Sequence, residues 1–137
     1  MDISLALGGG GSKGNAHIGV LRRLDQHGFN IRAIAGTSFG ALVSAFYALG
    51  YPPDEIEATF TSFDQNKIFG HAPEDEPSFM GIAGGAEWLE IRLGGKTFAD
   101  LKIPCVLTAV DLNTGKEMLL SEGNLLDAVL ASAAIPG

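Results

Sequence analysis

The sequence predicts an α/β domain with a mostly parallel sheet and helices packed on its faces. Two short apolar runs each end in a glycine turn, and a helical pattern of apolar residues follows each turn, all within about the first 50 residues. A strand, a turn and a helix in repeated succession favour parallel neighbours in one sheet. With 137 residues, the chain is long enough for one domain, or part of one, with a real core.

The first unit is a strand followed by a helix. Residues 3–7 form a mostly apolar run that stops at the four glycines of residues 8–11. Apolar residues recur at helical spacing after Gly14, and Gly28 stands where a glycine would end that helix.

The second unit repeats the pattern. Residues 31–35 predict another short strand, residues 36–40 a second glycine turn, and residues 41–49 a helix. Because this helix is apolar on nearly every side, it should be buried.

The rest of the chain is less regular. Residues 54–63 predict an amphipathic helix with an acidic first turn, whereas residues 64–95 mix prolines, glycines and isolated aromatics and suggest an irregular insertion or cap. Residues 104–110 and 117–120 predict two strands joined by a turn, and residues 125–134 predict a second buried helix.

Charge, cysteine content and hydropathy exclude several classes of protein. The net charge of −7 argues against nucleic acid as a partner. Cys105, the only cysteine, cannot form an internal disulfide or a cysteine-based zinc site. The chain begins without a basic targeting segment, and the longest apolar run, residues 39–49, is too short to span a bilayer. We therefore expect a cytoplasmic protein.

The most specific motif is Gly36-Thr37-Ser38-Phe39-Gly40, which fits the G-x-S-x-G pattern of a nucleophile elbow. It lies between a predicted strand and a predicted buried helix, the context that the motif requires. Such a turn strains the backbone of its serine and needs very small residues, here Gly36 and Gly40, on both sides. Ser38 is thus a candidate nucleophile. The alternative is a serine that only caps the helix.

A second motif, G-x-G-x-x-G, covers residues 9–14 directly after the first predicted strand. Backbone N–H groups of Gly9, Gly10 and Gly11 can form a nest for a phosphate or for a developing oxyanion. A dinucleotide site would require an acidic residue at the end of the second strand, where the chain has the serine turn instead. A Walker A loop is excluded because Lys13 precedes Gly14. Lys13 is either part of the anion site or a solvated loop cation.

No general base for Ser38 is evident. His71 is the only histidine beyond the serine and lies in the irregular segment, while His17 and His27 fall on the first helix, where structural roles are expected. Asp111 ends a strong strand, but a turn carboxylate that accepts backbone N–H bonds is the favoured interpretation.

Together these residues resemble the patatin-like phospholipases, particularly the short bacterial patatin-like esterases. The resemblance covers most of the chain, namely residues 5–14, residues 17–21, the Ser38 turn and the tail at residues 131–137, and is weakest over residues 64–95. It implies a patatin-like sandwich with helices on both faces of the sheet and a Ser-Asp dyad with Ser38 as nucleophile. It also implies an oxyanion hole from the backbone of Gly9, Gly10 and Gly11, and a basic residue at Lys13.

One departure from the family pattern is clear. The family's base is the Asp of an Asp-Gly pair that follows the Ala-Ile-Pro-Gly segment, and no Asp in this sequence precedes a glycine. We expect that Asp beyond residue 137, so that residues 1–137 are the N-terminal part of a patatin-like domain with little ester turnover of their own.

The resemblance implies a lipid or acyl ester as substrate, and neither a metal nor an organic cofactor. Phe69, Phe79 and Met80 are candidates either for an acyl groove or for packing of the insertion. Transient contact with a membrane surface and a homodimer through the helix at residues 125–134 are further expectations. Two other classes stay open: a nucleotide- or phosphate-binding module that uses the glycine loop, and a patatin-like interaction protein without catalysis.

Overall fold

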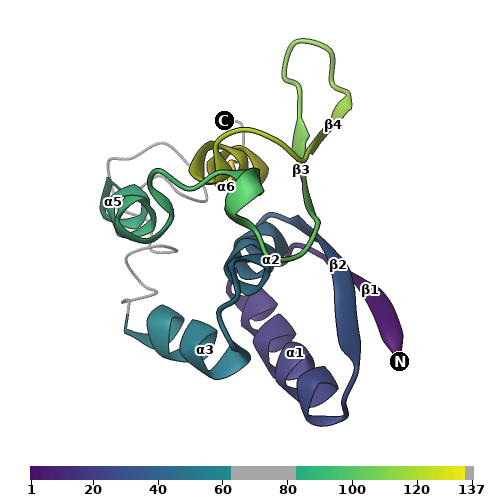
Figure 1. Cartoon of the computed structure of the whole chain (residues 1–137). Helices are drawn as coiled ribbons and strands as arrows, with labels where there is room; N and C mark the ends of the chain where they lie inside the picture. Colours follow the sequence, from purple (N-terminus) through teal and green to yellow (C-terminus); the bar gives the residue numbers. More distant parts are fainter. Residues whose placement is uncertain (63–82, 135–137) are drawn as a thin grey trace.

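The computed structural model describes residues 1–62 and 83–134, which form an α/β fold around one four-stranded sheet (Figure 1). The strands are β1 (Asp2–Leu7), β2 (Asn30–Thr37), β3 (Cys105–Val110) and β4 (Glu117–Leu120), and they lie in that order across the sheet. The first three are parallel and β4 is antiparallel to β3. The predicted fold class, with a mostly parallel sheet, is confirmed.

Each glycine turn leads from a strand into a helix, as predicted. β1 is followed by the short 3-10 helix η1 (Gly11–Asn15) and by α1 (Ala16–Gln26), and β2 is followed directly by α2 (Phe39–Leu49). Gly28 and Gly50 follow α1 and α2 with φ of +74° and +102°, values that glycine adopts without steric cost.

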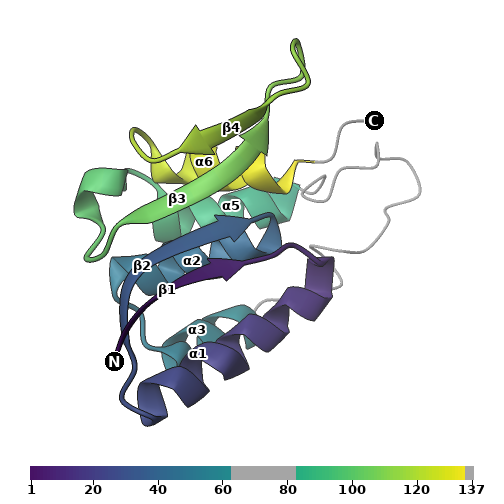
Figure 2. The ribbon, with the colours of Figure 1, turned by 90° about the vertical axis from the view of Figure 1, so that its right-hand side faces the viewer.

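The described helices lie on one face of the sheet, whereas helices were expected on both. Figure 2 shows α2, α5 (Ala83–Leu93) and α6 (Leu125–Ala133) behind the sheet, with α1 and α3 (Pro53–Thr61) below them. Neighbouring parallel strands in an unchanged order, joined by right-handed crossovers, place their connecting helices on the same side. The opposite face is exposed at Ser4, Ala6 and Arg32.

The core is centred on α2, which is buried along most of its length as its composition predicts. The ring of Phe46 is fully buried and meets the rings of Tyr51 and Phe60 edge to face, at centroid distances of 5.2 Å and 5.3 Å. This geometry is favourable for aromatic pairs. The helix that follows Ser38 is therefore fixed by packing on several sides.

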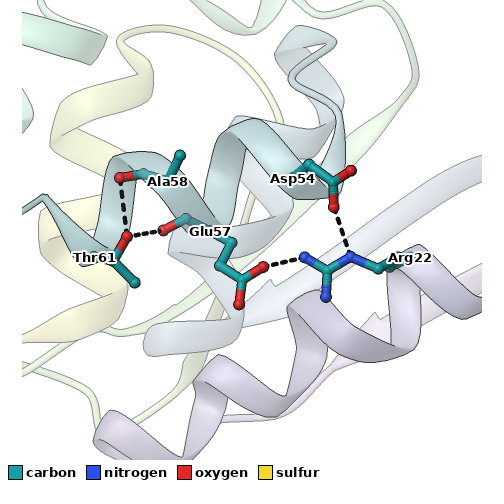
Figure 3. A network of polar contacts seen from close by, with 5 residues as sticks. All are labelled: Arg22, Asp54, Glu57, Ala58 and Thr61. Carbon is teal, nitrogen blue, oxygen red and sulfur yellow. Dashed lines mark hydrogen bonds and ion pairs between the residues drawn. The ribbon is translucent and has the colours of Figure 1, made fainter.

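An ion-pair network joins α1 to α3 (Pro53–Thr61), as Figure 3 shows. Arg22 Nε donates to Asp54 Oδ1 at 2.6 Å, and the same guanidinium also donates to Glu57. These bonds raise the pKa of Arg22 above its ordinary value. Since the network is open to solvent, it orients α3 on α1 more than it stabilises the fold.

Helix α5 (Ala83–Leu93) lies within the segment expected to be irregular. Its buried residues follow helical spacing and are Gly85, Trp88, Leu89 and Leu93. The sequence does not predict this helix, because the two glycines at positions 84 and 85 are typical of a loop. Trp88 packs against Phe60 at 5.7 Å between ring centroids. Tertiary packing therefore stabilises a helix where local propensity is poor.

The last described helix, α6 (Leu125–Ala133), packs against β3, α2 and α5. Asn124 Oδ1 accepts the Asp127 N–H at 2.9 Å and caps the helix. A short 3-10 helix, η2 (Phe98–Asp100), precedes β3. Within residues 1–62 and 83–134, every helix is too short or too polar to cross a bilayer.

Candidate functional site

The backbone of Ser38 is strained. This residue joins β2 to α2 with φ 56° and ψ −121°, and among the described residues it is the only non-glycine with a positive φ. Such a conformation costs on the order of 1–3 kcal/mol and persists where the surrounding structure enforces it. The strain predicted for the serine of an elbow is therefore present at Ser38.

Gly36 and Gly40 allow the turn to close. A Cβ atom on Gly36 would lie 2.6 Å from the Cα of Ala41, and one on Gly40 would lie 2.6 Å from the carbonyl oxygen of Gly8. Both obstacles are backbone atoms, which cannot move aside as a flexible side chain can. The turn thus requires glycine at both positions, for the reason that the sequence suggested.

The Ser38 hydroxyl does not cap α2. Ser38 occupies the position before the first helical residue, but in the described part of the chain its side chain makes no capping hydrogen bond. The interpretation of Ser38 as a simple helix cap is therefore wrong. The hydroxyl, on a partly exposed residue, stands at the positive end of the α2 dipole.

The glycine loop lies against this serine. A Cβ atom on Gly9 would be 3.3 Å from Ser38 Cβ and 4.0 Å from Ser38 Oγ. Gly10 and Gly11 follow with φ of +140° and +57°, and a Cβ on Gly10 would meet nothing within 4 Å. Gly9, one of the three predicted oxyanion-hole residues, thus lies in contact distance of the serine.

Lys13 and Gly14 take different places at the end of the loop. Gly14 is buried against Phe39, and a Cβ on Gly14 would lie 2.8 Å from Phe39 Cβ, so this glycine permits η1 to pack on the first turn of α2. Lys13 is exposed, and its backbone N–H donates to the Gly10 carbonyl at 3.3 Å.

Ser132 is a site residue to which the sequence assigned no role. Its Oγ on α6 accepts a hydrogen bond of 2.8 Å from the backbone N–H of Ser38, which is 94 residues earlier in the chain. Nearby, the hydroxyls of Thr37 and Thr108 share a bond of 2.7 Å that ties the end of β2 to β3. The signal for Ser132 was its place in the tail segment that carries the family resemblance.

His17, His27 and Asp111 occupy the structural positions that the sequence favoured for them. His17 is half-buried on α1, with Nε2 2.8 Å from the Gly8 carbonyl oxygen, and His27 is exposed at the end of the same helix. Asp111 Oδ1 accepts the Asn113 N–H at 2.9 Å, and this bond lowers the pKa of the carboxyl. Asp111 is therefore a turn carboxylate in the described structure.

Four residues named from the sequence are outside the part of the chain that the structure describes. Phe69, His71, Phe79 and Met80 fall outside the described residues. Within the residues that are described, no group of three or more His, Cys, Asp or Glu side chains is arranged to hold a metal ion.

The parallel sheet, the glycine loop and the strained serine together define an α/β protein with the geometry of a nucleophile elbow. The chain belongs to the patatin-like phospholipase family, whose family model matches residues 5–137.

Its relatives include an uncharacterized NTE family protein of Mycobacterium bovis, 38% identical over 98% of this chain and 38% of the relative. A lysophospholipase NTE1 of Mycosarcoma maydis is 52% identical over 35% of this chain and 2% of its own length. The type III effector protein ExoU has a similar fold, with a TM-score of 0.60 and 18% identity over 98% of this chain and 39% of that structure. The chain thus spans about 38% of the length of the Mycobacterium bovis relative.

Proposed function

We propose that this chain carries the nucleophile and the oxyanion loop of a lipid acyl hydrolase. The observation that carries the proposal is the strained backbone of Ser38, which holds a hydroxyl without a capping role next to Gly9. Membership of the patatin-like phospholipase family supports a lipid or acyl ester as the substrate.

In the proposed reaction, Ser38 Oγ attacks the ester carbonyl and transfers its proton to a general base. The tetrahedral oxyanion accepts hydrogen bonds from the glycine loop, each such donor being worth about 3 kcal/mol. Collapse breaks the bond to the leaving alcohol, which takes the proton, and leaves an acyl-Ser38 ester that water hydrolyses.

The general base in this proposal is an aspartate beyond residue 137. Asp111 is engaged in its own turn, and no Asp of the sequence precedes a glycine as the family resemblance requires. General-base assistance contributes typically about 10²–10⁴-fold to such a step. We therefore expect little turnover from residues 1–137 alone.

The test is covalent labelling of a form of the protein that continues through the Asp-Gly segment. A fluorophosphonate should modify Ser38, as mapped by mass spectrometry, and Ser38→Ala should abolish the adduct. Ser4→Ala, which changes an exposed serine of β1 outside the glycine loop, is the control and should label normally. An adduct on another serine, or equal labelling after Ser38→Ala, would refute the assignment. Stabilisation by nucleotides without any acylation would favour a phosphate-binding module instead.

A further inference from the structure

A helix side chain holds the first peptide of the glycine loop. His17, the second residue of α1, has Nε2 2.8 Å from the Gly8 carbonyl oxygen. Because a carbonyl oxygen only accepts hydrogen bonds, the proton of this bond belongs to Nε2 and the imidazole is the donor.

The hydrogen bond from His17 restricts a loop that is otherwise free to adopt many backbone conformations. Residues 8–11 are four consecutive glycines without side chains, and glycine loses more conformational freedom on folding than any other residue. Gly10 and Gly11 already adopt positive φ values. A hydrogen bond from α1, which is anchored by the buried Ile18 and Leu21, restricts the loop at the point where it leaves β1.

The same bond sets the direction of the next N–H group. The described residues contain no cis peptide bond, so the Gly8 carbonyl and the Gly9 N–H point in opposite directions across their shared peptide plane. With the carbonyl held on His17, the Gly9 N–H points away from the imidazole. Gly9 itself lies next to Ser38, with a Cβ on Gly9 placed 3.3 Å from Ser38 Cβ.

We propose that His17 is a positioning residue for the oxyanion hole, acting by orienting the Gly8-Gly9 peptide so that the Gly9 N–H meets the oxyanion formed at Ser38. This inference rests on the proposed acyl-hydrolase function. His17 touches neither substrate nor nucleophile in this role. The bound ester carries no oxyanion, and the negative charge develops only as the transition state and the tetrahedral intermediate form. The effect of His17 should therefore appear in kcat and leave KM close to its wild-type value.

The experiment compares two substitutions of nearly equal length in the form of the protein that continues through the Asp-Gly segment. Gln at position 17 keeps an N–H donor at its tip, whereas Met does not. His17→Met should lower kcat by about 10- to 100-fold, a part of the loss seen when an oxyanion donor is removed. His17→Gln should restore most of the lost rate. His27→Ala, at the exposed far end of α1, is the matched histidine control and should retain full activity.

The hydrolysis rate is divided by the amount of Ser38 that a fluorophosphonate has labelled when labelling is complete. Molecules of a variant that are unfolded and cannot react are thereby left out of the comparison. A purely structural role predicts fewer labelled sites with an unchanged rate for each. Equal kcat per site in His17→Met and wild type, or failure of His17→Gln to recover the rate, would overturn the role of His17. Absence of hydrolysis and labelling in the wild type would instead overturn the proposed function.

Discussion

Replacing Ser38 by glycine should stabilise the protein while removing its nucleophile. Glycine adopts φ near +56° without the steric cost that serine bears there, and the strain released is on the order of 1–3 kcal/mol. Glycine also gives the unfolded chain more conformational freedom, which lowers the free energy of unfolding and so offsets about 0.4–1 kcal/mol of that gain. Because the Ser38 hydroxyl makes no capping bond to α2, its loss costs no helix cap. A net gain of about 1 kcal/mol remains.

The proper reference for this change is Ser38→Ala, which also lacks the hydroxyl but keeps the strain. Urea unfolding followed by circular dichroism should place the midpoint of Ser38→Gly about 0.3–1 M above that of Ser38→Ala, with equal slopes. Ala58→Gly, at an exposed position of α3 with ordinary helical backbone, is the control. Its free energy of unfolding should fall by about 0.5–1 kcal/mol, because no strain is released there. If Ser38→Gly is no more stable than Ser38→Ala, the backbone of Ser38 is not strained and the turn is not a strained nucleophile elbow.

Two other predictions concern Ser132 and Cys105. Ser132→Ala leaves the Ser38 N–H without its acceptor, so it should lower the free energy of unfolding by about 1–3 kcal/mol and slow fluorophosphonate labelling of Ser38. Ser132→Thr keeps the hydroxyl and should preserve both the stability and the labelling rate. Identical stability of Ser132→Ala and the wild type would contradict this prediction. Burial raises the pKa of the Cys105 thiol from 9.0 to about 12, so the free energy of unfolding should be insensitive to this group below pH 9 and fall above it, by up to about 1.4 kcal/mol per pH unit. Urea titrations from pH 8 to 11 should show a smaller decline for Cys105→Ala than for the wild type, and parallel declines would show that this thiol ionises equally in both states.

Much of the fold could be predicted because its signals are local. Strands β1, β2 and β3 are short apolar runs bounded by glycine or proline, and Gly28 and Gly50 mark the ends of α1 and α2. Helix α5 was missed because the two glycines at positions 84 and 85 are poor helix formers, and the partners that stabilise it, among them Phe60, are distant in sequence. The helical spacing of its buried residues can be recognised only once the structure shows which residues pack into the core.

In the candidate site, too, some features follow from local sequence and others from contacts between distant residues. The sequence alone determined the Ser38 turn and the glycine loop, because a tight strand-to-helix turn and a nest of N–H groups each require glycine at fixed local spacing. The contacts within the site come from tertiary packing: Gly9 lies against Ser38, His17 donates to the Gly8 carbonyl, and Ser132 accepts the Ser38 N–H. These contacts depend on how β1 and β2 pair and on where α1 and α6 pack. Pairing and packing are set by burial of the whole core, and no short stretch of sequence encodes them.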